Sequence, residues 1–150
     1  MQNNPEKLKA AIYYRISKKA RNDIRMQRKI CRKYCLKQKI NIACEYIDRG
    51  FSGRTKNRPA LNKLLEEAES NKFNCVVVYK VDRLGRKFLH FNNFIEHFEK
   101  KRIRIISATQ NFDNFTPEGK FMLRMLTILA EFESEMISKR IIDGLRSSKK

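Results

Sequence analysis

The stretch NCVVVYKV, residues 74–81, is a nearly continuous run of β-branched and aromatic side chains. A strand with one face in water alternates apolar and polar residues, whereas a strand covered on both faces has a continuous apolar run of this kind. Parallel sheets are covered on both faces because their crossover helices pack there. The stretch therefore predicts a buried strand of a parallel sheet.

The segments on either side of this strand alternate between strand and helix patterns. Further strands are predicted at 10–16, 40–48 and 103–109, and helices at 22–39, 60–70 and 88–100. The helical segments place apolar residues at intervals of three and four, which gives one buried face. The alternation predicts an α/β domain with a mostly parallel sheet of four to five strands, flanked by helices.

The last third of the chain predicts one long helix, from 117 to about 147. Thr116 is the expected N-cap, Pro117 suits the first helical position, and Glu118 lies in the first turn. The segment FMLRMLTILAEF, residues 121–132, is apolar around most of the helix circumference. One small domain cannot bury such a helix on every side, so we expect it to project and to be covered by a second subunit. We divide the chain into an α/β body, 1–116, and a helical part of the same domain, 117–150.

The charge of the chain points to a polyanionic partner. Its 34 Lys and Arg residues face 16 Asp and Glu residues, a net charge of +18. Nucleic acid is the usual partner at such a charge, and a membrane surface is the less common one. The first residues lack the apolar core of a signal peptide, and no apolar run is long enough to cross a membrane. Four cysteines without a C-x-x-C pair predict free thiols in a reducing cytoplasm.

Cationic side chains gather where the predicted strands end. Arg15 and Ser17 close the first strand and project to the same side, because side chains alternate along a strand. Other polar residues follow the next two strands: Asp48, Arg49, Arg54 and Arg58 after the second, and Asp82, Arg83 and Arg86 after the third. Ligands of open parallel sheets bind beyond the carboxyl ends of the strands. Guanidinium groups around a hydroxyl there predict a site for phosphate chemistry.

Several alternatives are compatible with these residues. Ser17 is also suited to be a helix N-cap, and the basic charge alone fits a non-catalytic nucleic-acid-binding module. A metal-dependent nuclease would need a carboxylate set such as Asp48, Asp82, Glu131 and Glu133 for Mg²⁺. Arginines directly after Asp48 and Asp82 would compete with a metal there. A Ser-His-Asp hydrolase is not expected, because the only histidines, His90 and His97, lie seven residues apart on one predicted helix.

The chain resembles the catalytic domain of the serine recombinases, the resolvase/invertase family, and most closely the large serine recombinases of phages and mobile elements. The resemblance is carried, in chain order, by YYRIS (13–17), Gln27, YIDRGFSG (46–53), NRPAL (57–61), VYKVDRLGR (78–86), TPEGKF (116–121) and LAEFESEMISKR (129–140). These stretches cover almost the whole chain. The resemblance implies a resolvase-like N-terminal-domain fold.

The resemblance also implies residue roles. Ser17 would attack the scissile DNA phosphate and form a 5′-phosphoserine link, while the strands are exchanged and religated. The phosphate would be held by Arg15, Arg58, Arg83 and Arg86, with Asp82 orienting the arginines or moving a proton. Gln27, Asp48 and Glu133 would support the site, and Arg54, Lys139, Arg140 and Arg146 would contact DNA. No metal or other cofactor is expected, because bond energy is kept in the phosphoserine.

The resemblance implies partners as well. Family members bind double-stranded DNA at att- or res-type sites, dimerise through the long helix, here 117–140, and form tetramers in the synaptic complex. We expect a cytoplasmic, nucleoid-associated protein of a bacterium or phage, without a membrane partner. The chain shows no helix-turn-helix or zinc-ligand pattern, so we expect it to be a catalytic fragment that lacks DNA-recognition domains. Ser134 departs from the family, which usually has arginine at that position.

Overall fold

The fold is built on a parallel sheet of four strands. The computed structural model describes residues 6–16, 23–51, 57–85 and 88–148. Within them the strands are β1 (Lys9–Ile16), β2 (Asn41–Arg49), β3 (Cys75–Val78) and β4 (Arg104–Ser107), in the spatial order β2-β1-β3-β4. Every pairing between these strands is parallel. The predicted α/β class is confirmed.

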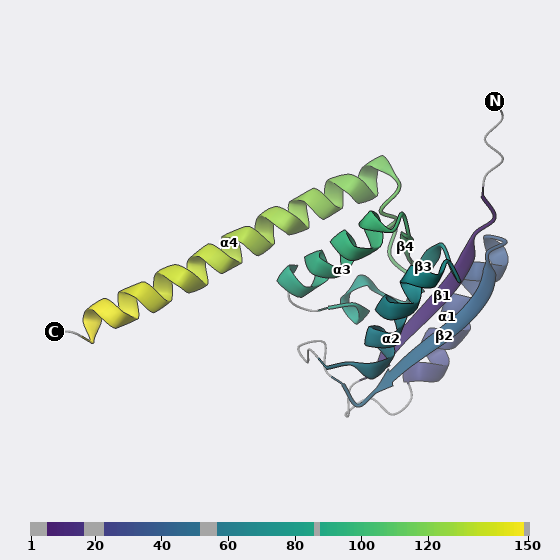
Figure 1. Ribbon diagram of the computed structural model, residues 1–150, viewed down its shortest axis with the longest axis horizontal. Coiled ribbons are helices and arrows are strands. Elements are labelled where there is room, and N and C mark those ends of the chain that lie inside the picture. Colours follow the sequence, from purple (N-terminus) through teal and green to yellow (C-terminus); the bar gives the residue numbers. More distant parts are fainter. Residues whose placement is uncertain (1–5, 17–22, 52–56, 86–87, 149–150) are drawn as a thin grey trace.

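Helices cover both faces of the sheet. Helix α1 (Asp23–Lys37) lies behind the sheet in Figure 1, and α2 (Pro59–Glu67) and α3 (Phe88–Lys100) lie on the other face. Strand β1 is buried from residue 10 to residue 16 and contributes side chains to the cores on both faces of the sheet. Its odd-numbered Tyr13 packs in the core formed with α2 and α3, whereas the even-numbered Tyr14 packs in the core formed with α1. This alternation is the period of two that a strand imposes on its side chains.

The predicted ends of β3 and β4 were wrong. The segment 74–81 was expected to be a single strand, but β3 stops at Val78, which pairs with Ser107 at the end of β4. The chain then turns through a short 3₁₀-helix, η2 (Val81–Arg83), in which the Val81 amide donates to Gln110 Oε1 at 2.9 Å. Strand β1 continues to Ile16, but its pairing with β3 ends at Tyr13 and Val78, where the chain turns away from the sheet. A second 3₁₀-helix, η1 (Ala68–Ser70), takes up the end of the helix expected over 60–70.

The four cysteines are free thiols, as the sequence predicted. Cys31, Cys35 and Cys75 are buried, and Cys44 is half-buried on β2. Burial raises the pKa of Cys31 and Cys75 to about 12 and that of Cys35 to about 11. These thiols therefore act as small apolar core groups.

Helix α4 (Pro117–Ser147) begins where the sequence predicted. Thr116 Oγ1 accepts a hydrogen bond from the Gly119 amide at 3.0 Å and donates one to the Asp113 carbonyl at 2.9 Å. A Cβ on Gly119 would lie 1.7 Å from the Asp113 carbonyl oxygen, so only glycine fits this tight start. The helix packs on α3 near its start and then leaves the body (Figure 1).

Beyond its first turns, α4 keeps a set of large apolar side chains in solvent. Leu123 is buried, but the following apolar residues that remain at least one-third exposed are Met125, Ile128, Leu129, Phe132, Met136, Ile137, Ile141, Ile142 and Leu145. We call this set the bare α4 stripe. Among the described residues, no helix is long and apolar enough to span a membrane.

Candidate active site

Three arginines converge on one backbone turn at the carboxyl ends of β1 and β3. Arg15 comes from β1, Arg58 stands directly before α2, and Arg83 lies in η2. Arg15 Nε and Arg58 Nη1 donate to the same acceptor, the Arg83 carbonyl oxygen, at 3.3 and 2.9 Å. We call Arg15, Arg58 and Arg83 the arginine cluster. The structure brings these three predicted site residues together.

The end of β1 and the turn after β3 are linked in both directions, because an arginine of each segment donates to backbone carbonyls of the other segment. Arg15 donates from Nη2 to the Asp82 carbonyl at 3.2 Å and from Nη1 to the Phe51 carbonyl at 3.2 Å. In return, the Arg15 carbonyl accepts from Arg83 Nη1 at 3.3 Å and from Gln27 Nε2 at 3.1 Å. Gln27 is fully buried and carries this contact across from α1. The predicted supporting residue Gln27 therefore touches the backbone of a cluster member.

Arg58 is fixed by aromatic rings as well as by carbonyls. Its guanidinium carbon lies 5.3 Å from the ring centre of Phe94 on α3 and 6.0 Å from that of Tyr13 on β1. Its Nη2 also donates to the Leu84 carbonyl. Only 2% of Arg58 is exposed. Ring faces attract cations in a desolvated site, so they compensate part of the cost of burying this charge.

Asp48 caps helix α2, which begins directly after Arg58, and in this way it fixes the position of Arg58. The N-cap residue of α2 is Arg58, whose side chain does not cap the helix, and Pro59 occupies the first position. Asp48 supplies the cap from β2: its Oδ1 accepts from the Ala60 amide at 2.9 Å and its Oδ2 from the Leu61 amide at 3.1 Å. The Tyr13 hydroxyl donates to the same Oδ2 at 2.8 Å. A carboxylate on helix amides is stabilised by the helix dipole, so Asp48 fixes the start of α2 and with it Arg58.

The arginine cluster has an excess of positive charge. Burial lowers the pKa of Arg15, and the neighbouring cation of Arg83 lowers it further. The Asp82 carboxylate lies beside the cluster, with its Oδ1 3.8 Å from Arg83 Nε and its side chain 45% exposed. Guanidinium groups gathered at one point in this way suit the binding of an anionic ligand.

Some predicted site residues lie elsewhere or outside the described part of the chain. Ser17, Arg54 and Arg86 fall outside the described residues. Glu133 is exposed on α4, and among the described residues it forms no hydrogen bond or ion pair with the cluster. Lys139, Arg140 and Arg146 are likewise exposed on α4. Within one copy of the chain, α4 therefore does not contribute these side chains to the arginine cluster.

The carboxylate set considered for Mg²⁺ does not form a site in the described structure. Both oxygens of Asp48 accept hydrogen bonds from α2 amides, and Glu131 and Glu133 are exposed on α4. No group of three or more His, Cys, Asp or Glu side chains is placed to bind a metal among the residues that the structure describes. This arrangement disfavours the nuclease alternative on the ligand geometry of these carboxylates.

Three aromatic residues of the site were missed in the sequence. Tyr13 binds Asp48 and lies beside Arg58, and Tyr79 lies under Arg83, with 5.8 Å from the guanidinium carbon to the ring centre. Tyr13 could have been found, because it precedes Arg15 by two residues and so lies on the same side of β1. Phe94 gave no signal, since its helix position resembles any other core contact.

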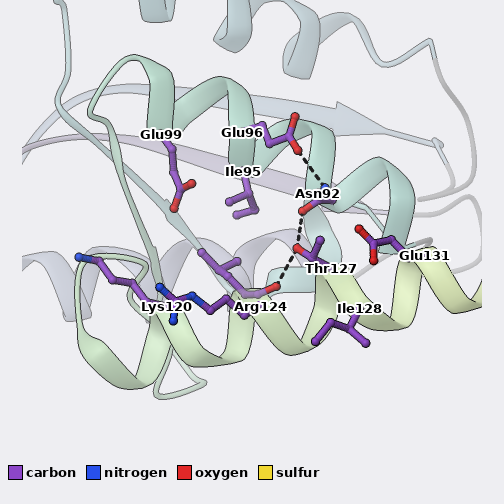
Figure 2. Close-up of a pocket in the computed structure, with 10 residues that line it drawn as sticks. Asn92, Ile95, Glu96, Glu99, Lys120, Arg124, Thr127, Ile128 and Glu131 are labelled. Atoms are coloured by element: carbon purple, nitrogen blue, oxygen red, sulfur yellow. Dashed lines mark hydrogen bonds between the residues drawn. The ribbon is translucent and has the colours of Figure 1, made fainter.

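A separate groove of about 680 Å³ lies between α3 and α4 (Figure 2). There the Thr127 hydroxyl donates to Asn92 Oδ1 at 2.9 Å, and Asn92 donates to Glu96 Oε1 at 3.2 Å. Glu131 lies at one end of this groove. None of the three clustered arginines lines it, so we assign it to the packing of α4 on the body.

Comparison with known proteins agrees with the geometry of the site. The family model described as "Resolvase, N terminal domain" matches residues 10–150. The chain belongs to the resolvase family. Its curated relatives include the serine recombinase Gin of Escherichia phage Mu, 33% identical over 71% of this chain and 54% of Gin. The Tn917 resolvase of Enterococcus faecalis is 36% identical over 65% of this chain and 52% of its own length.

Two solved structures are similar to this resolvase-family domain. The N-terminal catalytic domain of TP901-1 integrase is 33% identical, with a TM-score of 0.78 over 85% of this chain and 98% of that domain. A resolvase-family recombinase from Streptococcus pneumoniae shares the fold, with a TM-score of 0.84 at 22% identity over 96% of this chain and all of the other. This resolvase-family domain spans about half the length of Gin and the Tn917 resolvase.

Proposed function

We propose that this resolvase-family domain catalyses site-specific DNA recombination with Ser17 as the nucleophile. The observation that carries the proposal is the arginine cluster. Arg15, Arg58 and Arg83 meet at the carboxyl edge of the sheet with excess positive charge, and Ser17 follows Arg15 by two residues. Guanidinium groups arranged in this way can bind the oxygens of a phosphodiester.

The proposed chemistry exchanges one phosphodiester for another. The Ser17 oxygen attacks the scissile phosphorus, the bond from phosphorus to the 3′ oxygen breaks, and the 5′ end stays joined to Ser17. The serine proton leaves to a base, and the departing 3′ oxygen gains a proton. A 3′-hydroxyl of the exchanged strand later attacks the phosphoserine and releases Ser17. Because one ester replaces another, the sequence of steps needs no nucleotide energy.

The arginines supply the electrostatic part of this reaction. Negative charge on the non-bridging oxygens is stabilised by fixed guanidinium groups, which bind phosphate through two parallel donors. We assign this role to Arg15, Arg58, Arg83 and Arg86, and proton transfer or orientation of the arginines to Asp82. In the described state, three of these side chains donate to backbone carbonyls. Phosphate binding would exchange some of those carbonyls for phosphate oxygens.

Other residues would position this set or bind DNA. Gln27 and Asp48 hold the ends of α1 and α2 against the cluster. Glu133 is assigned to the site only in the assembled protein, because it lies on the projecting helix. Arg54, Lys139, Arg140 and Arg146 are proposed to contact the phosphate backbone of att- or res-type duplex DNA. We further infer dimerisation through residues 117–140, tetramers during strand exchange, and action at the nucleoid of a bacterial or phage-infected cell.

A covalent-complex assay tests the proposal. The full protein is incubated with att- or res-type DNA from its own locus in EDTA and then denatured. We expect a protein–DNA adduct that persists in EDTA, that disappears in Ser17→Ala, and that drops at least about 100-fold in rate in Arg83→Lys, because an ammonium cannot replace the guanidinium fork. An adduct that forms in Ser17→Ala, or that needs a divalent metal, would contradict the proposal.

A further inference from the structure

Helix α1 presents a ladder of exposed cations to solvent. Arg25, Lys29, Lys33 and Lys37 follow one another at intervals of four residues and are all exposed. Residues four apart lie on the same face of a helix, about 6 Å apart along its axis. The four side chains therefore form one row, about 18 Å long, which we call the α1 row.

The α1 row differs from the other two arginines of the same helix. Arg32 donates to both carboxylate oxygens of Glu45 at 2.8 and 3.0 Å, and Arg28 lies 3.4 Å from the same carboxylate. Within the described residues, no member of the α1 row has a carboxylate partner. Like charges four residues apart destabilise a helix, so this arrangement has no stabilising role in the fold.

The α1 row begins close to the proposed reaction site, and it lies on a different face of the sheet from α4. Gln27, one turn into α1, donates to the Arg15 carbonyl, so the first residues of α1 lie beside the arginine cluster. Helix α1 lies on one face of the sheet, and α3 and α4 lie on the other (Figure 1). Residues 117–150 carry seven Lys and Arg against five Asp and Glu, a net charge of +2, whereas residues 23–37 alone carry +5, from six against one. The strongest cationic surface of a helix is thus on α1.

We propose that the α1 row binds the phosphate backbone of the duplex on which the arginine cluster acts, beside the scissile phosphate. This proposal rests on the proposed function and adds a second contact surface to it. A row of exposed, mobile lysines suits sequence-independent contact with phosphates, because each ammonium acts as a point charge that releases a counterion from DNA. The contact adds affinity and orients the body without reading the sequence.

The test compares charge-matched variants of this chain in their binding to a fluorescent duplex of arbitrary sequence, measured by anisotropy from 50 to 200 mM salt. The α1 variant is R25Q/K29Q/K33Q/K37Q. The control, K63Q/K72Q/K100Q/R102Q, removes four exposed cations on α2, α3 and the loops that follow them. A second variant, R25K/K29R/K33R/K37R, keeps the charge of the row. Gln forms helices about as well as Lys, so the α1 variant is expected to fold and to melt no lower than the wild type.

We expect the α1 variant to bind the duplex at least about tenfold more weakly, with a salt slope smaller by about 3 to 4, roughly 0.9 for each phosphate that the row no longer neutralises. The charge-retaining variant should bind like the wild type, and the control should change the slope by less than about 1. An unchanged affinity and salt slope in the α1 variant would overturn the proposal. The α1 row would then be assigned to the binding of another polyanion, such as an acidic protein. An equal reduction in the control would overturn it too, because net charge alone would then explain binding.

The proposed function fails independently of this result. A wild-type protein that forms no Ser17-linked adduct would refute the catalytic assignment, whatever the anisotropy measurement gives. A normal adduct combined with an unchanged salt slope in the α1 variant would refute the α1 row alone.

Discussion

The arginine cluster and the bare α4 stripe differ in how far a single chain satisfies them. Arg15 and Arg58 are buried, and their donors reach carbonyls in two separate segments, at Phe51 and at residues 82–84. The α4 stripe, by contrast, exposes Ile128 and Phe132 each to 58%, although both would be favoured in a core. The contacts that position the arginine cluster are made within one chain. The bare α4 stripe has apolar side chains that one chain does not cover.

The arginine cluster is suited to an anionic ligand, whereas the bare α4 stripe is suited to an apolar protein surface. The polar region is built in advance, which keeps the cost of assembling a charged site low at the moment of reaction. The apolar region contributes little to the fold of one copy, and we expect it to contribute on the proposed association. Substitutions in the two regions should therefore affect different measurements.

The largest effect is expected at Arg15. Arg15→Ala leaves the carbonyls of Phe51, Asp82 and Arg83 without this donor and opens a cavity, so the free energy of unfolding should fall by about 3–5 kcal/mol. Urea denaturation measures this decrease. The matched control Arg146→Ala, on exposed α4, should stay within about 0.5 kcal/mol. Equal effects of the two substitutions would remove the distinction between the regions.

The start and the end of α4 should respond oppositely to the same change. Gly119→Ala places a Cβ against the Asp113 carbonyl and should destabilise the chain by at least about 2 kcal/mol. A Cβ on Gly144 meets nothing within 4 Å, so Gly144→Ala should stabilise the helix by roughly 0.5–1 kcal/mol. Thermal unfolding of both variants checks the signs. A stabilising Gly119→Ala would show that α4 does not begin against Asp113.

The bare α4 stripe should act on association rather than on folding. Ile137→Ser should leave the free energy of unfolding of the dilute chain within about 0.5 kcal/mol. It should weaken self-association about tenfold or more, because burying an isoleucine contributes about 1.5–3 kcal/mol. Sedimentation equilibrium measures this, with Leu36→Ser as the control, at a position on α1 that is 81% exposed, against 57% for Ile137. Weaker association in the control alone would move the interface away from α4.

The smallest effect is expected at Glu45, which pairs with the α1 arginines. Burial alone would raise the pKa of Glu45, but hydrogen bonds from Arg32 and Tyr14 outweigh it and hold the pKa below its ordinary value. A carboxylate with a lowered pKa stabilises the fold above its unfolded pKa of about 4.3, and this contribution is lost as the pH falls through the folded pKa. The free energy of unfolding of the wild type should therefore exceed that of Glu45→Gln by less than about 1 kcal/mol at pH 7. This difference should disappear toward pH 3. A gap that widens on acidification would reverse the assigned sign.

Much of the fold could be predicted because hydrophobic period and capping residues act locally. The run CVVV of β3, the N-cap Thr116 and the apolar spacing of α3 each carry their own signal. The end of β3 could not be predicted, because the turn that follows it is held by the Gln110 side chain, about thirty residues further along the chain. Likewise, α1 ends at Lys37, where the Ile40 amide returns to the Cys35 carbonyl and Lys39 takes a positive φ of 57°.

The charged members of the candidate site were visible in the sequence, but its aromatic residues and the contacts that hold the arginines were not. Arg15, Arg58 and Arg83 follow strand ends or a turn, and parallel topology brings such ends together. Their acceptors, however, are backbone carbonyls, which every residue has and which therefore leave no sequence signal. Asp48 was visible as a carboxylate at a strand end, but its part in capping α2 became clear only from its contacts with Ala60 and Leu61.

The central claim is that a serine oxygen attacks DNA beside the arginine cluster. The most direct measurement is mass-spectrometric peptide mapping of the adduct that the full protein forms with att- or res-type DNA in EDTA. The account predicts a nucleotide phosphate attached to the Ser17 side chain and to no other residue. An adduct on another residue, or no adduct from a folded protein that binds the same DNA, would contradict it.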